Sequence, residues 1–315
     1  MMHSLSLSDV LAEHARSRPQ VTAVVDGEVR LTYPELDTRV TRLASALAGL
    51  GVSAGDRVLW LGQNAHAVLE LLLTCSRLGA IFCPANWRQS EDELRFIVGD
   101  LTPAVVIWEP SDTTRSLHAD PGASRPAVWV QAGEDYEELV AGGSIRDFPE
   151  VADTEPTLAL YTAAFDGRPN AALQSSAALI AHSASLLVVR QMEPGFTFLN
   201  NGPLFHVGTM MFCLATLQIG GTNVFTPAFD AEEVCRLIDA ERVTQAFLFG
   251  QMIDAVVKAN AGGKYDLSSL RFVSHSAEWD EMITVDDSPW CRSKMGGYGQ
   301  TEVGGMLTFL GLAEG

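Results

Sequence analysis

The sequence predicts an α/β protein made of two subdomains with mostly parallel sheets. Short apolar runs alternate with amphipathic segments of helix length along most of the chain, a pattern typical of parallel strands connected by helices. The chain has 315 residues, about enough for two domains of ordinary size. Hydrophobic residues make up 47% of it and charged residues 19%, which supports a large buried core and argues against disorder.

The first half opens with a clear helix signal. Thr32, Pro34 and Glu35 form the pattern of a capping box with proline in the first turn, and the helix they begin is expected to end at Gly49–Gly51. Strands and helices are then expected to alternate: a strand at 58–62, a helix at 65–79 capped by Asn64, a strand at 80–84, a helix at 90–99 and a strand at 104–108.

Composition changes between residues 111 and 154, where Asp, Gly, Ser and Pro become frequent. We interpret this stretch as a loop or small excursion between two α/β halves and place the domains at 1–155 and 156–315. The second half resumes the alternation, with strands expected at 158–162, 196–199, 222–226, 245–249 and 271–276, and helices at 176–190, 207–217, 230–241 and 251–260.

Charge and cysteine usage restrict the class of protein. The net charge of −18 repels phosphate backbones and anionic membranes, so nucleic acid is not expected as a partner. The start lacks a signal-peptide pattern, and no apolar run is long enough for a membrane span. The five cysteines are scattered and never spaced as CxxC, so we expect a cytoplasmic, reduced protein without structural zinc.

The stretch Tyr161–Ser176 has the layout of a strand, a tight loop and a helix start, where phosphates are commonly bound. It contains Gly167–Pro169 but lacks the GxxxxGK[ST] pattern of a nucleotide-binding loop. Asp166 adds a negative charge in its middle. On turn chemistry alone, an ordinary turn remains an equal alternative.

Two later motifs add chemistry. Residues 202–208 read GPLFHVG and place His206 at a strand-to-helix junction, where a lone histidine is more often a structural side chain. Residues 297–302 read GYGQTE. In this motif Tyr298 can stack on a base, Thr301 can bond a phosphate oxygen and Glu302 can hold Mg²⁺.

Taken in order, these three motifs resemble the adenylate-forming superfamily, which includes acyl- and aryl-CoA synthetases, luciferases and the adenylation domains of peptide synthetases. The resemblance covers nearly the whole chain, including LTYPELDTRVTRLASALAGLGVSAGDRV at 31–58 and RLGAIFCPANWR at 77–88. It implies the large N-terminal domain of such an enzyme, with two stacked α/β subdomains. It also leads us to expect a truncated chain, with the small C-terminal domain missing after Gly315.

The resemblance implies a role for each matching residue. Glu302 would organise Mg²⁺, Thr301 would lie near the α-phosphate and His206 would gate the acyl pocket, so these three are the expected catalytic residues. The implied nucleotide site comprises Thr162, Gly167, Arg168, Asn170, Ser276, Ala277, Gly297, Tyr298, Gly299, Gln300 and Thr301. The implied acyl-binding residues are His206, Thr209, Met210 and Phe249; for the last three, ordinary core packing remains an open alternative.

The phosphate loop departs from the family pattern, which has Ser, Thr or Gly at Ala163–Asp166 and Lys at Asn170. Backbone N–H groups do much of the phosphate binding, so the lost hydroxyls remove only part of it. Arg168 remains to supply positive charge. We favour a loop retuned around Arg168, Asn170 and Mg²⁺ over one that no longer binds a triphosphate.

The implied reaction is ATP-dependent activation of a carboxylic acid to an acyl-adenylate, followed by formation of a CoA thioester. ATP, Mg²⁺ and CoA are its cofactors, with a carrier protein as the other candidate acceptor. The acid is expected to be an apolar acyl or aryl compound, and the isolated chain is expected to be weak or inactive.

The alternative function is a non-catalytic acyl- or nucleotide-binding protein derived from the same fold, and a homodimer is compatible with either function. A plain NTPase or dehydrogenase is disfavoured because GK[ST] and a strand-following GxGxxG are absent. A serine hydrolase is disfavoured because no GxSxG turn occurs.

Overall fold

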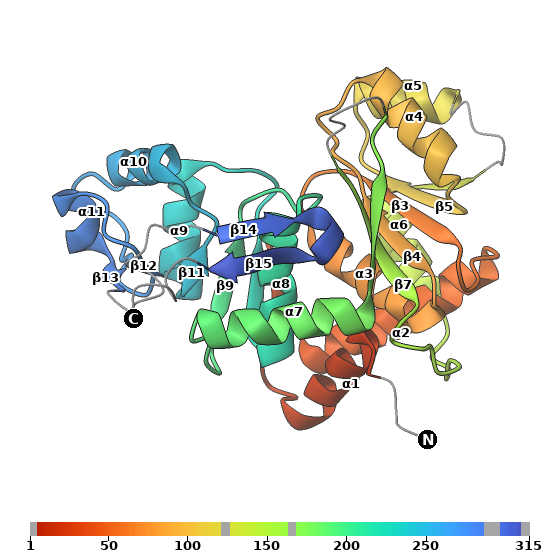
Figure 1. The fold of residues 1–315 in the computed structure, drawn as a ribbon, viewed down its shortest axis with the longest axis horizontal. Helices are drawn as coiled ribbons and strands as arrows, with labels where there is room; N and C mark the ends of the chain where they lie inside the picture. Colours follow the sequence, from red (N-terminus) through yellow and green to blue (C-terminus); the bar gives the residue numbers. More distant parts are fainter. Residues whose placement is uncertain (1–4, 121–126, 163–167, 287–296, 310–315) are drawn as a thin grey trace. The chain divides into compact units, whose positions relative to one another are not determined.

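The protein is described by a computed structural model that covers residues 5–120, 127–162, 168–286 and 297–309. The chain divides into two compact units, each with its own main sheet (Figure 1). The first unit comprises Met1–Pro19 and Thr32–Ile180, and the second comprises Gln20–Leu31 and Ala181–Gly315. The predicted α/β class with mostly parallel sheets is confirmed, because helices and strands alternate and most strand pairs are parallel.

The first unit contains a six-stranded sheet in the order β6-β5-β3-β4-β7-β8. Its pairs are parallel except for β7 and β8, which are antiparallel. The strands are β3 (Arg57–Leu61), β4 (Ile81–Pro84), β5 (Val105–Trp108), β6 (Val128–Gln131), β7 (Pro156–Tyr161) and β8 (Ala171–Ser175). The central strands are buried on both faces, as expected of parallel strands covered by helices.

Six helices accompany this sheet: α1 (Leu7–Ser17), α2 (Tyr33–Gly49), α3 (His66–Leu78), α4 (Glu91–Leu101), α5 (Asp112–Ala119) and α6 (Glu134–Gly142). At the predicted start of α2, the backbone N–H of Thr32 donates to the Glu35 carboxylate at 2.7 Å, so the capping box is confirmed. The predicted cap of α3 by Asn64 is wrong. The residue preceding α3 is Ala65, which makes no side-chain capping bond.

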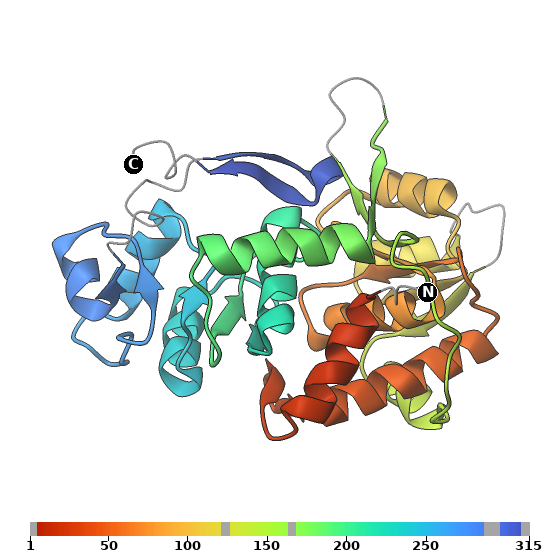
Figure 2. The same cartoon turned by 60° about the horizontal axis from the view of Figure 1, so that its bottom comes forward.

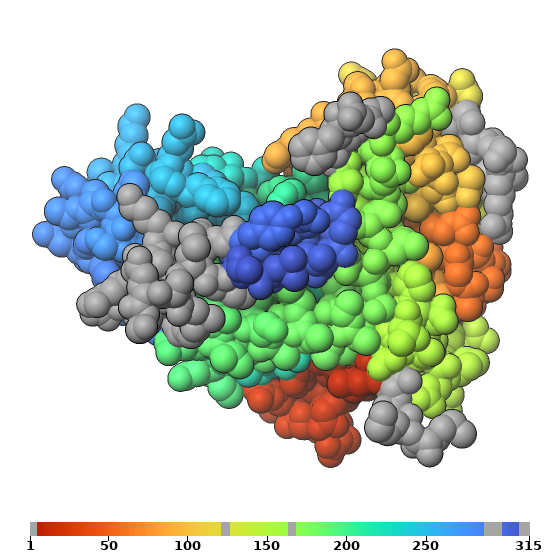
Figure 3. Space-filling view, viewed as in Figure 1, coloured from red at the N-terminus to blue at the C-terminus, as the bar shows by residue number. Residues whose placement is uncertain are grey.

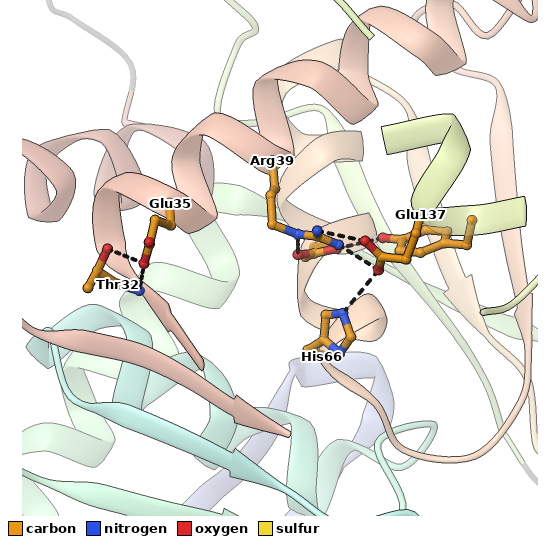
Figure 4. A network of polar contacts seen from close by, with 7 residues as sticks. Thr32, Glu35, Arg39, His66 and Glu137 are labelled. Carbon is orange, nitrogen blue, oxygen red and sulfur yellow. Dashed lines mark hydrogen bonds and ion pairs between the residues drawn. The ribbon is translucent and has the colours of Figure 1, made fainter. Parts of the chain in front are cut away.

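Helices α2, α3 and α6 share a network of polar contacts (Figure 4). Arg39 of α2 binds the carboxylates of Glu70 on α3 and Glu137 on α6, and the Tyr136 hydroxyl donates to Glu70 at 2.8 Å. Glu70 is fully buried. A buried carboxylate is tolerated only where charge and hydrogen bonds compensate it, and Arg39 and Tyr136 together do so.

The stretch from 111 to 154 is more than the loop or small excursion we expected. It contains α5, β6 and α6, and β6 extends the sheet in parallel with β5. The polar composition of this stretch obscured the signal because β6 is an edge strand and is only half buried.

The predicted order of strand, tight loop and helix at Tyr161–Ser176 also needs correction. Strand β8 intervenes between the loop and helix α7 (Ser176–Val189) and pairs back onto β7. The Ala-rich sequence after Pro169 therefore extends an antiparallel hairpin before the helix starts. Local helix propensity at these alanines is outweighed by strand pairing along β7.

The second unit contains a five-stranded sheet in the order β11-β9-β10-β1-β2. Its strands are β1 (Thr22–Asp26), β2 (Val29–Thr32), β9 (Thr197–Asn200), β10 (Thr222–Phe225) and β11 (Gln245–Ala246). Strand β1 pairs in parallel with β10, nearly 200 residues later in the chain. We did not predict β1 or β2, and β11 is shorter than the expected strand at 245–249.

Four further helices belong to the second unit, and α7 runs from the first unit into it. They are α8 (Val207–Ile219), α9 (Ala231–Glu241), α10 (Gly250–Ala259) and α11 (Ala277–Met282). Two small two-stranded sheets complete it: β12 (Arg271–Phe272) with β13 (Thr284–Val285), and β14 (Gly297–Gln300) with β15 (Gly305–Phe309).

The division into units differs from the expected domains at 1–155 and 156–315. The boundary near residue 155 falls within the first unit because β7 and β8 pair with its sheet. None of the helices in the described residues is both long and apolar enough to cross a membrane.

Candidate functional site

The predicted phosphate loop closes the β7–β8 hairpin of the first unit. The backbone N–H of Thr162 donates to the carbonyl of Asn170 at 2.9 Å, so these two residues form the base of the loop. The loop residues from Ala163 to Gly167, including the predicted nucleotide residue Gly167, lie outside the described residues. At the end of β7, the Tyr161 hydroxyl donates to Asp100 at 2.7 Å, and burial with this bond raises the pKa of Tyr161.

Arg168 lies on the surface, with its guanidinium carbon 5.5 Å from the centre of the Phe96 ring. Within the described part of the chain its guanidinium forms no ion pair, so its charge is not neutralised by a carboxylate there. A cation held over an aromatic face keeps its charge and its outer N–H donors. Asn170 is exposed as well.

The GYGQTE motif of the second unit forms a hairpin. Strand β14 carries Tyr298, a short 3₁₀ turn, η1 (Thr301–Val303), carries Thr301 and Glu302, and β15 returns. Figure 3 shows the atoms of this hairpin on the surface. The side chain of Glu302 is exposed, Tyr298 is 55% exposed and Thr301 is half-buried.

Hydrogen bonds hold the aromatic ring of this motif in place. The backbone N–H of Tyr298 donates to the Thr308 hydroxyl at 3.0 Å. The side-chain amide of Gln300 donates to the Tyr298 hydroxyl. More than half of Tyr298 is exposed while its hydroxyl is hydrogen-bonded, which suits stacking on a flat ligand.

His206 is the N-cap residue of α8. Its Nδ1 accepts a hydrogen bond from the backbone N–H of Gly208 at 3.0 Å. Desolvation lowers the pKa of His206, although the residue as a whole is exposed. Since Nδ1 accepts, the neutral ring carries its proton on Nε2. This N–H has no partner among the described residues, so it can donate to a ligand.

The ends of β9 and β11 meet beside His206. The side-chain amide of Asn201 donates to the carbonyl of Phe247 at 2.8 Å and accepts from its backbone N–H at 2.9 Å. The rings of Phe247 and Phe249 form an edge-on pair with centroids 4.8 Å apart. Ligands of α/β sheets bind at the carboxyl ends of the strands, and this edge is such a place.

The predicted acyl residues differ in exposure. Phe249 is 58% exposed, whereas Thr209 and Met210 are buried. The buried Thr209 hydroxyl oxygen has no hydrogen-bond partner in the described residues. A β-carbon at Gly202 would lie 2.3 Å from the Phe247 ring and 2.5 Å from this oxygen, so only glycine fits between them.

The Ser274–Ala277 loop is fixed by carboxylates outside the motif. Ser276 caps α11 by accepting from the N–H of Trp279 at 3.2 Å, and Ala277 is the first residue of that helix. Asp280 accepts bonds from the Ser274 hydroxyl and the backbone N–H of His275. The His275 ring contacts Asp254 of α10 at 2.8 Å.

The predicted residues thus form two groups. Thr162, Arg168 and Asn170 belong to the first unit, and the remaining described residues belong to the second. Our prediction missed Asn201, Phe247 and Asp254. The polar pair Asn200–Asn201 directly after an apolar strand was the signal that pointed to the first of these.

A cleft of about 370 Å³ lies in the first unit, and none of the residues predicted for the site lines it. Arg77 and Arg146 line it together with four carboxylates, and the guanidinium of Arg77 is already paired with Asp37 at 2.7 Å. It contains no group from the three motifs, so it does not enter the candidate site.

The described residues contain no cluster of three or more His, Cys, Asp or Glu side chains suited to hold a metal ion. Mg²⁺ in nucleotide enzymes commonly uses one or two carboxylates together with substrate phosphates. The single exposed carboxylate of Glu302 fits that mode of binding, and a site made wholly of protein ligands does not fit.

Curated CoA synthases and ligases are similar to this chain over most of its length. The chain is 35% identical over 273 residues to a feruloyl-CoA synthase from an Amycolatopsis species, and the match covers 86% of this chain and 54% of that protein. It is 33% identical over 282 residues to an indoleacetate–CoA ligase from Aromatoleum aromaticum, with the same coverage. The chain therefore spans about half the length of these curated relatives.

The fold matches a solved structure as well. A protein from Rhodopseudomonas palustris assigned as a long-chain-fatty-acid CoA ligase superposes with a TM-score of 0.83 and 31% identity, over 98% of this chain and 79% of the other. The sequence profile described as AMP-binding enzyme matches residues 11–314. The chain belongs to the AMP-binding enzyme family.

Proposed function

We propose that the protein activates a carboxylic acid with ATP as an acyl-adenylate and then transfers the acyl group to CoA. Membership of the AMP-binding enzyme family and similarity to two CoA ligases support this reaction. The observation that carries the proposal is the β14–β15 hairpin, which presents an aromatic ring, a hydroxyl and a carboxylate at Tyr298, Thr301 and Glu302.

In the first step, a carboxylate oxygen of the acid attacks the α-phosphorus of ATP, and the bond to the β-phosphate oxygen breaks to release pyrophosphate. In the second step, the thiol sulfur of CoA attacks the acyl carbonyl carbon, its proton passes to solvent and AMP leaves. Positioning and charge stabilisation supply most of the rate in such phosphate chemistry.

The nucleotide roles follow from the chemistry of each side chain. Tyr298 would stack on the adenine, and the Thr301 hydroxyl would donate to an α-phosphate oxygen. Glu302 would hold Mg²⁺, which supplies neutralisation of phosphate charge when bound. Arg168 and Asn170 would face the outer phosphates. The Arg168 guanidinium, which forms no ion pair with the described residues, offers the charge that the missing lysine would give.

The acid is proposed to be an apolar acyl or aryl compound. The Phe247–Phe249 pair lies beside the N-cap residue His206, and most of Phe249 is uncovered. The desolvated, neutral imidazole of His206 suits an apolar group better than a charged one. Feruloyl and indoleacetate groups, which the two relatives' names specify, are both aryl acids, so aryl acids should be tested first.

Binding is the first experiment, and it uses the 315-residue chain. Titration calorimetry with ATP and Mg²⁺ should show binding, and saturating nucleotide should raise the melting temperature by mass action. Glu302→Gln should weaken only the Mg²⁺-dependent part of the affinity. Equal weakening with and without Mg²⁺, or no binding at millimolar ATP, would contradict the assignment.

The alternative is a non-catalytic binding protein. Two features of the phosphate loop favour it: the acidic Asp166, and Asn170 where the family has a lysine. Pyrophosphate exchange with the full-length protein separates the two. Exchange that depends on an added aryl or fatty acid supports the enzyme, whereas ATP binding without exchange supports the alternative. Thioester formed with CoA but not with a carrier protein would then identify the acceptor.

A further inference from the structure

His182 of α7 holds strand β15 by a single directed hydrogen bond. Its Nε2 accepts from the backbone N–H of Met306 at 3.0 Å, although the two residues are 124 positions apart. A backbone N–H can only donate, so Nε2 must be unprotonated and the neutral ring must carry its proton on Nδ1. Desolvation lowers the pKa of His182, which favours this neutral form. Figure 2 shows α7 as an unbroken helix beside the hairpin.

The contact is close as well as directed. Gly305 has φ +142°, a conformation that side chains rarely adopt. A β-carbon there would lie 2.6 Å from Nε2 of His182 and 3.0 Å from the sulfur of Met211 on α8. Two helices therefore meet the backbone of β15 directly, at a position that only glycine can occupy.

The pairing of β15 with β14 links the His182 contact to the GYGQTE motif. Gly305 lies opposite Gln300, and Met306 lies opposite Gly299. A β-carbon at Gly299 would lie 2.3 Å from the carbonyl oxygen of Gly305, so the two strands touch backbone to backbone. A shift of β15 away from His182 would displace β14, and with it the residues on either side of Gly299.

We propose that His182 is a positioning residue for the nucleotide site, acting through Met306 to place Tyr298, Thr301 and Glu302 for an adenine nucleotide. The nucleotide part rests on the proposed function, whereas the anchoring part rests on the contacts alone. No motif in the sequence marks this histidine, because its partner is a backbone N–H in a distant strand.

Amide hydrogen exchange of this chain tests the anchor. In His182→Leu, which cannot accept a hydrogen bond, the Met306 amide should exchange about 10-fold faster than in the parent chain, because a protecting bond is lost. In His182→Gln, whose side-chain oxygen lies near the position of Nε2, protection should return. Ser185→Ala, an exposed change on the same helix, should leave it unchanged. Equal protection in all four proteins would overturn the anchor.

Pyrophosphate exchange of the full-length protein tests the positioning role. His182→Leu should raise the KM for ATP roughly 3- to 10-fold, and His182→Gln should restore it. A merely structural role would lower the amount of active protein at unchanged KM, and that result would overturn the proposal. If the parent protein showed no pyrophosphate exchange, the proposed function would be contradicted instead. Amide hydrogen exchange would still decide whether His182 anchors β15.

Discussion

His206 combines a structural role with a predicted functional one, and the structure shows how to separate them. Its ring caps α8 through the Gly208 N–H, and the resemblance places it at the acyl pocket. An Ala substitution would remove both roles. Asn is among the strongest N-cap residues, so it replaces the cap without replacing the imidazole.

His206→Asn should therefore keep the stability of the chain, whereas His206→Ala should cost about 0.5–2 kcal/mol of unfolding free energy. If the ring gates the acyl pocket, His206→Trp should lower the activity of the full-length protein with long acids more than with short ones. Urea unfolding and an acid panel measure the two effects. Unchanged acid preference in both the Asn and Trp variants would leave only the capping role.

The cap should also respond to pH, because the folded state lowers the pKa of His206. The folded protein then binds fewer protons than the unfolded chain. The neutral His206 ring therefore contributes to the stability of the fold above the ordinary histidine pKa of about 6.5. This contribution is lost as the pH falls through the lower pKa that His206 has in the folded protein.

Arg168 is the second residue at which a single substitution tests a proposed role. Arg168→Ala should weaken ATP binding roughly 10- to 100-fold, the loss of a charge-assisted contact of about 1.5–3 kcal/mol. AMP binding should be unchanged, because only the outer phosphates are proposed to reach the loop. Arg168→Lys is the matched control and should retain part of the affinity. Calorimetry that finds ATP and AMP bound alike in all variants would show a loop without a triphosphate role.

Among the elements, helices α2, α3 and α6 depend on one buried charge. Burial opposes the charge of Arg39, yet its hydrogen bonds to Glu137 and Glu70 raise its pKa. Burial and the negative charge of Glu70 raise the pKa of Tyr136. Tyr136 therefore keeps its hydroxyl proton at neutral pH and donates it to Glu70.

Arg39→Met removes the charge that compensates Glu70 and should cost about 3–5 kcal/mol of unfolding free energy, the usual cost of a buried unpaired charge. The double variant Arg39→Met/Glu70→Gln should cost less than the single one, because no buried charge is left unpaired. Arg16→Ala breaks the exposed pair with Glu13 and should change stability by about 0–1 kcal/mol. Urea denaturation that ranks the single and double variants the other way would contradict the network.

The same network predicts an acid response. The His66 ring, 3.7 Å away, and Arg39 lower the pKa of Glu137 to about 2, against an ordinary glutamate value of about 4.3. This carboxylate therefore stabilises the folded state above about pH 4.3 and loses that contribution as the pH falls toward about 2. The stability difference between the parent chain and Glu137→Gln should shrink over this window.

At the scale of the whole molecule, the second unit depends on residues from the start of the chain. Strand β1 lies between β10 and β2 in the second sheet, although α2 and the entire first sheet follow it in sequence. An unpaired β10 would present backbone donors and acceptors to other chains.

Deleting residues 1–31 should therefore destabilise the second unit and lead to aggregation, whereas deleting only residues 1–4 should not. Light scattering during thermal unfolding measures the difference. A monomeric, cooperatively folded protein after the longer deletion would show that the second sheet does not need β1.

The sequence by itself determined the local features of this protein. The capping box at Thr32, the helix at 176–190 and the three motifs at 161–176, 202–208 and 297–302 could be located because their signals lie within a few residues of one another. The motifs also identified the family. The residue types proposed for the nucleotide and the acid follow from them, and those roles stay predictions.

Only the tertiary structure decided which partners these residues meet. Strand β1 pairs with β10, Asn201 binds the backbone of Phe247, and His182 binds the N–H of Met306. Strand β8 forms where the alanines favoured a helix, because its backbone pairs with that of β7. The contacts of β1, Asn201 and His182 join a side chain or strand to backbone groups far along the chain. Backbone groups are the same in every residue, so no local pattern specifies which one is met.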